Sequence, residues 1–492
     1  MTTITLDAPL NWREVAQIAE GARLELSSAA IARMANARQI VDSIVDRDIR
    51  GYGINTGVGA LCNTIVDRSD QSALSHNILM SHACGVGTPL KSEETRAIMA
   101  AMINTFSHGY SGVRPVIAEM LCAMLNNGCT PVVPSAGSVG YLSHAAAISL
   151  ILIGEGTAAF GTDTLTGQQA LMKMGQKPLT LQAKEGLSLV NGTSCSTGLS
   201  ALAVFRAEKL LNWGNKAAAA TFEAVGGHLG AFDQTGLGLR KNVGVQRIGA
   251  ILRELLARSG NLTKRAGLRT QDCLSLRAIP QVHGALYDTI NHVGDTINDE
   301  LASITDNPSV MGTPQNPQVF SQANAVGASI ALAMDNLSTA CALFAGISER
   351  RTDRMINPLV SGLPAFLAPD GGVFTGFQVV QLTALSLSAE CRRLAAPVSL
   401  NGGISAALQE DALTHATPAA LNTLRICENI ADVISIELLT AVQALRLLDD
   451  PSSISPKIKE ICQKAYQSIP PYKDQHPISD DIQKMRDLVE LG

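Results

Sequence analysis

Apolar positions recur with helical spacing along most of the chain. Ile31 and Ile44 belong to one apolar face of a helix predicted over Ser28–Asp46. Ser27 stands directly before this segment and is a good N-cap residue. Regular strand alternation is scarce, so the pattern predicts an all-α fold. Further helices are predicted over Ser92–Phe106, Pro115–Asn126 and Leu142–Ile153.

The second half of the chain carries longer apolar patterns. Gln322–Arg351 and Phe377–Leu394 are nearly uninterrupted by Gly or Pro, and both are apolar on most sides. A helix that is apolar all round is a central one, wrapped by other helices or by partner chains. Pro418–Leu447 is another long candidate, with Thr417 placed to cap it and Pro418 at the first helical position. These patterns predict a long central helix bundle.

Two segments are too rich in glycine and small polar residues to fit the helical pattern. Gly51–Gly59 is predicted to be a loop held close to another backbone, and Gly186–Gly198 is predicted to be a second, polar loop. We therefore divide the chain into a smaller, loop-rich N-terminal part over residues 1–190, the helix bundle over residues 191–450, and a C-terminal surface segment over residues 451–492.

Composition narrows the classes of protein. The chain has 492 residues, a net charge of −5, 46% apolar residues and 16% charged residues, which is enough for several domains or one large helical body. No block of Lys and Arg stands out, so neither a nucleic acid nor a membrane is expected as a partner. The apolar run Ala328–Ile347 carries Asp335 near its middle, which indicates a buried helix and not a membrane span.

The ten cysteines are scattered singly along the chain. None forms a Cys-x-x-Cys pair, so neither a structural zinc site nor a thioredoxin-like motif is indicated, and no metal is expected. Free thiols in this number fit a reducing compartment. The N-terminus has neither the basic nor the apolar region of a signal peptide. The predicted location is therefore the cytoplasm.

Four short motifs are specific in combination. They are Tyr-Gly-Ile-Asn-Thr-Gly over residues 52–57, Ser-His-Ala-Cys-Gly-Val-Gly over residues 81–87, Gly-Leu-Ser-Leu-Val-Asn-Gly-Thr-Ser over residues 186–194, and Arg-Thr-Gln-Asp-Cys-Leu-Ser-Leu-Arg-Ala-Ile-Pro-Gln over residues 269–281. Together they resemble the histidine and aromatic amino-acid ammonia-lyase family, from about Leu10 to Leu448. The resemblance implies the all-α, long-helix fold of that family and a homotetramer whose pockets are assembled from several chains.

The resemblance implies three catalytic residues. Tyr52 matches the tyrosine base that removes the β-proton, and Asn191 matches the asparagine beside the electrophile and the substrate amine. Glu390 falls on a long helix where the family often places a pocket acid. Each also has an ordinary interpretation: a loop aromatic for Tyr52, turn chemistry for Asn191, and a solvated or ion-paired helix residue for Glu390.

The resemblance also implies residues that bind the substrate, namely His82, Arg277, Asn324 and Gln409. Arg277 matches the family's carboxylate-binding arginine, and a planar guanidinium suits that task because it gives bidentate hydrogen bonds. The alternative for Arg277 is a structural ion pair with an acid such as Glu300, and the alternative for His82 is a structural role.

The chain departs from the family pattern most at the electrophile segment. Residues 137–140, Gly-Ser-Val-Gly, run directly into residues 141–144, Tyr-Leu-Ser-His, without the Ala-Ser-Gly triad and the Asp-Leu segment that the family has between them. That triad cyclises into methylidene-imidazolone, so no cofactor is expected unless the protein carries an Ala-Ser-Gly loop that the printed sequence lacks. Aromatic or imidazole groups of the family are also replaced by small apolar ones at Leu274, Val326 and Ala412.

Two interpretations of function remain open. The first is an ammonia-lyase-like enzyme, a carbon–nitrogen lyase or a related elimination or rearrangement catalyst, that acts on an amino acid or related carboxylate without methylidene-imidazolone. The second is a non-catalytic homologue, a structural or regulatory subunit of an active lyase. The retained Tyr52, Asn191 and Arg277 favour the enzyme, and the missing triad favours the second. The fumarase and argininosuccinate-lyase group is disfavoured because its Gly-Ser-Ser-x-Met-Pro loop is absent.

Overall fold

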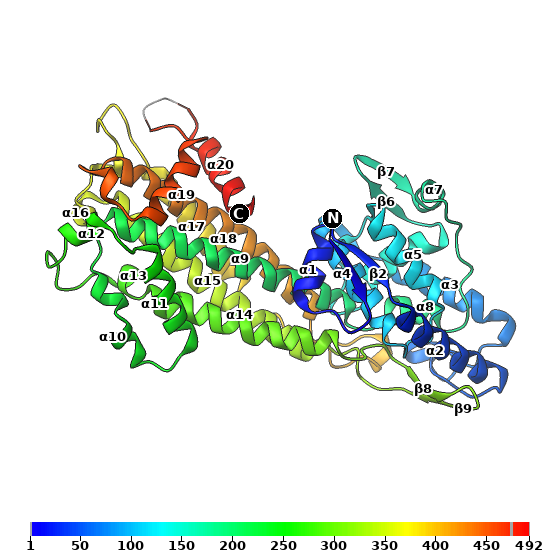
Figure 1. Cartoon of the computed structure of the whole chain (residues 1–492). Coiled ribbons are helices and arrows are strands. Elements are labelled where there is room, and N and C mark those ends of the chain that lie inside the picture. Colours follow the sequence, from blue (N-terminus) through cyan, green and yellow to red (C-terminus); the bar gives the residue numbers. More distant parts are fainter. Residues whose placement is uncertain (1, 473–475, 492) are drawn as a thin grey trace. The chain divides into compact units, whose positions relative to one another are not determined.

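The computed structural model describes residues 2–472 and 476–491 (Figure 1). Internal contacts divide the chain into two compact units, each assembled from three segments. The first unit comprises Met1–Phe205, Val293–Asp335 and Pro397–Leu421, and the second comprises Arg206–His292, Asn336–Ala396 and Asn422–Gly492. Both units are thus discontinuous in sequence, whereas the division predicted from the sequence used the contiguous segments 1–190, 191–450 and 451–492. A hydrophobic pattern is read along the chain, so it does not indicate which distant segments pack together.

Helices dominate both units, and the predicted all-α fold is confirmed. The helices within the first unit are α1 (Trp12–Ala19), α2 (Ser28–Asp46), α3 (Gln71–His82), α4 (Ser92–Ser107), α5 (Pro115–Asn126), α6 (Ser143–Leu150), α7 (Gly167–Lys173) and α8 (Glu185–Val190). Those within the second unit are α10 (Gln234–Gly238), α11 (Val243–Leu255), α12 (Gly260–Lys264), α13 (Leu274–Arg277), α16 (Pro358–Ser361), α17 (Gln378–Leu394), α19 (Pro456–Tyr466) and α20 (Ile478–Leu491). Four boundaries between the units fall inside α9 (Ser194–Ala224), α14 (Ile279–Leu301), α15 (Ala328–Ile356) and α18 (Ala416–Arg446), and the fifth follows α17, between Ala396 and Pro397.

The strands that the structure describes are short and belong to the first unit. One sheet pairs β1 (Thr3–Leu6) with β2 (Arg23–Leu26) in parallel, with Thr3 opposite Arg23. The others are antiparallel: β3 (Val86–Pro89) with β5 (Pro134–Ala136), β4 (Cys129–Pro131) with β6 (Thr157–Phe160) and β7 (Asp163–Thr166), and β8 (Ser309–Thr313) with β9 (Asn316–Phe320).

Several predicted helices occur with the bounds that the sequence indicated. Ser28–Asp46 and Pro115–Asn126 match, and the Ser27 hydroxyl accepts a hydrogen bond from Ala30 N at 3.0 Å, as an N-cap does. The helix predicted from Ser92 ends one residue later than expected, at Ser107. Helix α17 begins one residue after Phe377.

The starts of two long helices differ from the prediction. Helix α15 begins at Ala328 and not at Gln322, because Gln322 N donates to Asn307 Oδ1 at 2.6 Å and the chain turns before the helix starts. The capping role predicted for Thr417 is wrong. Helix α18 begins at Ala416, and the Thr417 hydroxyl donates to Gly140 O at 3.0 Å.

The predicted polar loop over residues 186–198 is also wrong, because most of it is helical in α8 and α9. Its glycines permit close helix packing. A Cβ on Gly186 would lie 2.2 Å from Ser75 O, and one on Gly198 would lie 2.5 Å from Ala97 O. Only glycine fits where a backbone approaches this closely. Residues 191–193 alone connect the two helices, so Asn191 is held between them.

An apolar cluster in the first unit supports the predicted loop at residues 51–59. Ile40 and Ile44 of α2 belong to this cluster together with Ile54 and Val310, and all four are at most 2% exposed. Ile54 therefore ties the loop to α2 and to the β8–β9 hairpin. Burying an aliphatic side chain of this size contributes about 1.5–3 kcal/mol.

Long helices run side by side in the second unit (Figure 1), where polar contacts connect them. The Arg351 guanidinium on α15 pairs with Glu437 on α18 at 2.5 Å, and both side chains are fully buried. Thr221 on α9 donates to the same carboxylate at 2.8 Å. Helix α15 is long and apolar enough to cross a membrane. However, 67% of its most apolar stretch of 18 residues is buried, as in the core helices of soluble proteins.

Candidate active site

The loop of residues 51–59 is fixed by its own polar groups and by close packing of Gly53 against a side chain of α8. Gly53 N donates to Thr56 Oγ1 at 3.0 Å. Gly53 has a φ of +60°, and a Cβ on it would lie 2.2 Å from a side-chain carbon of Leu187 on α8. Glycine alone meets both conditions, so the sequence here defines one loop geometry.

This loop positions the phenol of Tyr52. The Tyr52 oxygen accepts a hydrogen bond from Gly59 N at 2.9 Å. Burial raises the pKa of Tyr52, the Gly59 N–H opposes that shift, and the charge of Glu410 adds to it. A phenol with a raised pKa holds its proton at neutral pH and is a stronger base once the proton has left.

A cavity of about 620 Å³ lies in the first unit, and we call it the Tyr52 cavity. Its lining comes from segments far apart in the sequence: the loop that begins at Tyr52, the end of α3, the turn before α6, the end of α8, and residues 307, 321–323, 325–326, 405–406 and 409–410. Of the residues predicted from the sequence, it brings together Tyr52, His82, Asn191 and Gln409.

Two of these residues have defined partners. His82 ends α3, and its Nδ1 lies 3.0 Å from Ser81 Oγ. Burial lowers the pKa of His82, which keeps the imidazole neutral at pH 7. Asn191 Nδ2 donates to Asn307 O at 2.6 Å, so the carboxamide oxygen of Asn191 is the acceptor not used in that bond.

Gln409 follows a tight turn. The backbones of Ser405 and Glu410 exchange hydrogen bonds of 2.8 and 3.3 Å, and a 3₁₀-helix, Ala406–Leu408, lies between them. All three residues of that 3₁₀-helix have a positive φ, which costs free energy in residues with a Cβ. The turn brings both Gln409 and Glu410 to the lining of the cavity.

The sequence interpretation missed a pair of residues in this cavity. The Tyr141 hydroxyl donates to Glu410 Oε2 at 2.7 Å, and both side chains line the Tyr52 cavity. Burial raises the pKa of Tyr141, and the hydrogen bond to Glu410 raises it further. The available signals were the position of Tyr141 directly after the shortened segment and the Gln-Glu-Asp tripeptide that contains Glu410.

The other predicted residues do not line the Tyr52 cavity. Asn324 is exposed, and its Nδ2 donates to Gln322 Oε1 at 3.1 Å. Glu390 is a half-buried residue of α17 in the second unit, where its hydrogen bonds to Arg393 lower its pKa. This contact agrees with the ion-paired alternative for Glu390.

Arg277 ends α13 in the second unit, where it lines a polar cavity of about 590 Å³ together with Asp272 and Gln281. Its Nε is buried and has no hydrogen-bond partner among the residues that the structure describes. Glu300, the alternative ion-pair partner of Arg277, belongs to the first unit and accepts a hydrogen bond from Thr193 at 2.6 Å. A buried donor without a partner is costly, which is typical of a group that binds a ligand.

The positions at which this chain departs from the family pattern also differ in whether they line the Tyr52 cavity. Val326 lines the Tyr52 cavity, whereas Leu274 belongs to the second unit and is 64% exposed. Ala412 is exposed and is not part of the cavity lining. Of the three replaced positions, Val326 alone belongs to the lining of the Tyr52 cavity.

The segment at residues 137–143 does not fit a methylidene-imidazolone group. It contains no Ala-Ser-Gly run, and its backbone is tied down where the group would form. The Ser138 hydroxyl donates to Tyr141 O at 2.9 Å, and Leu142 N donates to Val190 O at 3.0 Å. We therefore derive no chemical step through this electrophile. Within residues 2–472 and 476–491, no group of three His, Cys, Asp or Glu side chains is arranged to hold a metal ion.

Residues 10–467 match the family model for aromatic amino acid lyases, and the chain belongs to that family. It is 39% identical over 496 residues to the histidine ammonia-lyase of Symbiobacterium thermophilum, covering 100% of this chain and 97% of the relative. It is 41% identical over 448 residues to the histidine ammonia-lyase of Deinococcus radiodurans, covering 89% and 85%. The relatives support the assignment of the chain as a lyase.

Solved structures agree with this assignment. The histidine ammonia-lyase of Trypanosoma cruzi matches with a TM-score of 0.92 and 32% identity, covering 100% of this chain and 94% of that chain. The tyrosine aminomutase of Streptomyces globisporus matches with a TM-score of 0.95 and 33% identity, covering 100% and 97%. The resemblance stated from the motifs and the fold that it implied are thus confirmed.

Proposed function

We propose that the chain is an ammonia-lyase-like enzyme, a carbon–nitrogen lyase or a related elimination or rearrangement catalyst, for an amino-acid-type carboxylated substrate. One observation carries the proposal: Tyr52, His82, Asn191 and Gln409 come from distant segments and line one cavity. Tyr52 is the base in this proposal, and Asn191 orients the substrate with its free carboxamide oxygen. The similarity to histidine ammonia-lyases supports this class of substrate.

We further propose that the reaction proceeds without methylidene-imidazolone. General acid–base groups supply about 10²–10⁴-fold acceleration and do not replace covalent capture of a poor leaving amine. The substrate therefore needs its own activated leaving group or an unusually acidic proton. The missing triad also favours a second candidate, a non-catalytic homologue that is a structural or regulatory subunit of an active lyase.

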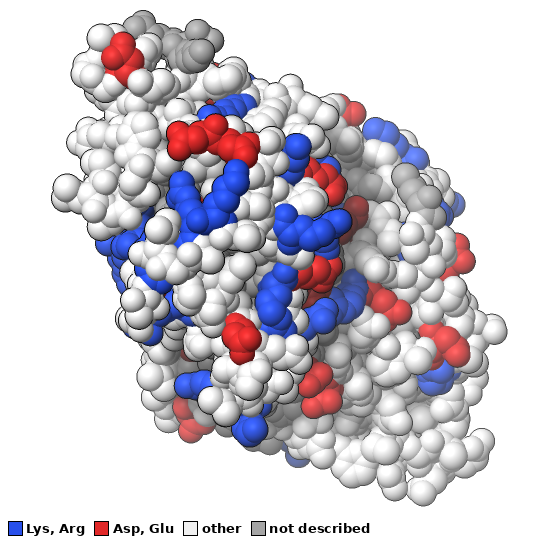
Figure 2. All heavy atoms as spheres, turned by 60° about the vertical axis from the view of Figure 1, so that its left-hand side comes forward, with Lys and Arg blue, Asp and Glu red and all other residues white. Residues whose placement is uncertain are grey.

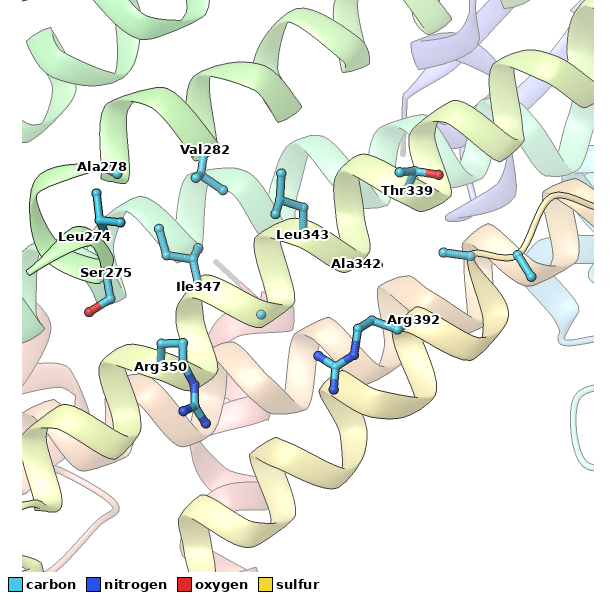
Figure 3. Close-up of a pocket in the computed structure, with 13 residues that line it drawn as sticks. Leu274, Ser275, Ala278, Val282, Thr339, Ala342, Leu343, Ile347, Arg350 and Arg392 are labelled. Atoms are coloured by element: carbon cyan, nitrogen blue, oxygen red, sulfur yellow. The ribbon is translucent and has the colours of Figure 1, made fainter.

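We propose that the protein is a cytoplasmic homotetramer. An apolar cavity of about 690 Å³ lies between α13, α14, α15 and α17, with Leu343 and Arg392 among its lining residues (Figure 3). Leu343 and Leu382 are 56% and 53% exposed on these helices. Wide uncharged areas surround intermixed basic and acidic side chains on the face in Figure 2. Apolar surface of this kind is typical of subunit contacts.

Sedimentation at micromolar concentration is expected to give a species of four chains of 51.7 kDa each. Leu343→Glu should weaken assembly because it places a charge on the exposed apolar face of α15. Met172→Glu is the matched control, since Met172 is 71% exposed on α7 in the other unit. A stable wild-type monomer would contradict the proposed tetramer.

Arg277 is proposed to bind the substrate carboxylate. It does not line the Tyr52 cavity of its own chain, so a neighbouring subunit would supply it to a complete site. A charge-assisted hydrogen bond is worth about 1.5–3 kcal/mol, and its loss weakens binding by about one to two orders of magnitude.

Calorimetric titration of wild type and Arg277→Met with amino acids and aryl-acrylates measures this effect. Arg240→Met, which removes an exposed arginine of the second unit, is the control. If Arg277→Met folds normally and binds as tightly as wild type, the carboxylate anchor is wrong. The non-catalytic subunit then becomes the better interpretation.

A further inference from the structure

The lining of the Tyr52 cavity contains an acidic residue and no Lys or Arg to balance it. Glu410 is the only Asp, Glu, Lys or Arg among its lining residues. The one histidine of the lining, His82, has a pKa lowered by burial and stays neutral. The remaining polar side chains of the lining carry phenols, amides and the hydroxyls of Ser321 and Ser405. The first unit therefore presents a carboxylate inside a mostly neutral cavity and supplies no cation to balance it.

The Glu410 carboxylate is held in a fixed place. Tyr141 donates to its Oε2 at 2.7 Å, and the backbone of Glu410 is fixed by paired hydrogen bonds with Ser405. The Thr417 hydroxyl anchors the turn before Tyr141 through Gly140 O. Within the described part of the chain, no hydrogen bond reaches Oε1 of Glu410, so that oxygen is left to accept one from a ligand.

Two aromatic rings add to this preference. Tyr52 and Tyr141 both line the cavity, and the charge of Tyr52 adds to the raised pKa of Tyr141. The face of an aromatic ring attracts a cation and repels an anion. A carboxylate beside two phenol rings is thus a pattern that recognises an ammonium group.

We propose that the Tyr52 cavity binds the ammonium group of its ligand at Glu410, that Tyr141 is the positioning residue for this carboxylate, and that the cavity binds primary amines that have no carboxylate. The proposal rests on the proposed function, since it names the end of the amino-acid-type substrate that this cavity receives. It assigns the carboxylate of that substrate to a different part of the site, at Arg277.

Isothermal titration of the full-length protein with two matched probes tests the proposal. The probes are 2-phenylethylamine, which keeps the ring and the amine, and 3-phenylpropionate, which keeps the ring and a carboxylate. The amine is expected to bind wild type, and Glu410→Gln should weaken that binding by about 10- to 100-fold because a charge-assisted hydrogen bond is lost. Glu254→Gln, which removes an exposed carboxylate of the second unit, should bind the amine as wild type does.

Tyr141→Phe tests whether Tyr141 positions the Glu410 carboxylate or only supports the fold. It removes the hydroxyl and keeps the ring, so amine binding should weaken by up to about tenfold while 3-phenylpropionate binding stays unchanged. In the Glu410→Gln background the same change should have no further effect on amine binding, because the two groups then no longer interact. Equal losses for both probes, or full additivity, would show that Tyr141 has only a structural role.

The outcomes distinguish this inference from the proposed function. If wild type binds amino acids but not 2-phenylethylamine, the ammonium site is wrong and the proposed function stands. If the amine binds through Glu410 but no amino-acid substrate is converted, the ammonium site stands and the enzyme assignment fails. Thermal unfolding of Glu410→Gln checks that this variant is folded. If it is not, the ammonium site is tested by comparing the binding of 2-phenylethylamine and 3-phenylpropionate to wild type.

Discussion

Purified protein is expected to form no urocanate, cinnamate or coumarate from histidine, phenylalanine or tyrosine at the rates ordinary for an ammonia-lyase. Enzymes accelerate reactions by about 10⁶–10¹⁷-fold, whereas general acid–base groups such as Tyr52 contribute about 10²–10⁴-fold. The shortfall is therefore at least about 100-fold. The segment at residues 137–143 offers neither the residues nor the free backbone for the family's electrophile.

Near-ultraviolet absorbance of the three products measures this result. The histidine ammonia-lyase of Symbiobacterium thermophilum, assayed at the same concentration, is a suitable positive control. Ordinary rates in the test protein would contradict the prediction and require that an electrophile is present. Intact mass then gives an independent check, because an Ala-Ser-Gly loop would add mass to the 51.7 kDa of the sequence.

Tyr52→Phe is expected to abolish turnover and to leave ligand binding nearly intact. The ring of Tyr52 remains in the cavity lining, and only the ionisable hydroxyl and its contact with Gly59 N are removed. A suitable substrate is an arylalanine with an electron-withdrawing ring substituent, such as 4-nitrophenylalanine, because its β-protons are more acidic. The base removes a β-proton, the electrons of that C–H bond form the double bond, and the ammonium group leaves as ammonia with the electrons of the C–N bond to give the acrylate.

Single-turnover absorbance and calorimetric titration together decide the Tyr52 prediction. Tyr287→Phe is the matched control, because this tyrosine of α14 lies outside the cavity lining and in the second unit. Turnover by Tyr52→Phe at the wild-type rate would remove Tyr52 from its role as base. Loss of binding with normal folding would show instead that the hydroxyl binds the ligand.

Local patterns predicted the helices well where one face meets a core. The helix from Ser28 to Asp46 has both a cap and an apolar face, and its bounds are confirmed. The pattern failed where a residue type is required by contact with another segment of the chain. Gly186 and Gly198 were interpreted as loop residues, but they are small because α8 and α9 pack against the backbones of Ser75 and Ala97.

The candidate site was predictable to the extent that motifs carry it. Four of the residues that the resemblance implied line one cavity, although no spacing along the chain indicates that His82 and Gln409 share a lining. The Tyr141–Glu410 pair was missed because the shortened segment indicates only that the triad is missing. Nothing in the sequence indicates which side chain lines the cavity in its place. The roles assigned to Asn324, Arg277 and Glu390 stay predictions.

The anchored turn before α6 also limits protein engineering. A graft of the family's triad would be inserted between Gly140 and Tyr141, where a Cβ on Gly140 would meet no atom within 4 Å. The inserted residues would, however, displace the Tyr141 hydroxyl from Glu410 Oε2 and strain the contact between Gly140 O and Thr417. A graft that installs the electrophile therefore gives up the carboxylate geometry of the present cavity, and Tyr141 needs redesign in the same step.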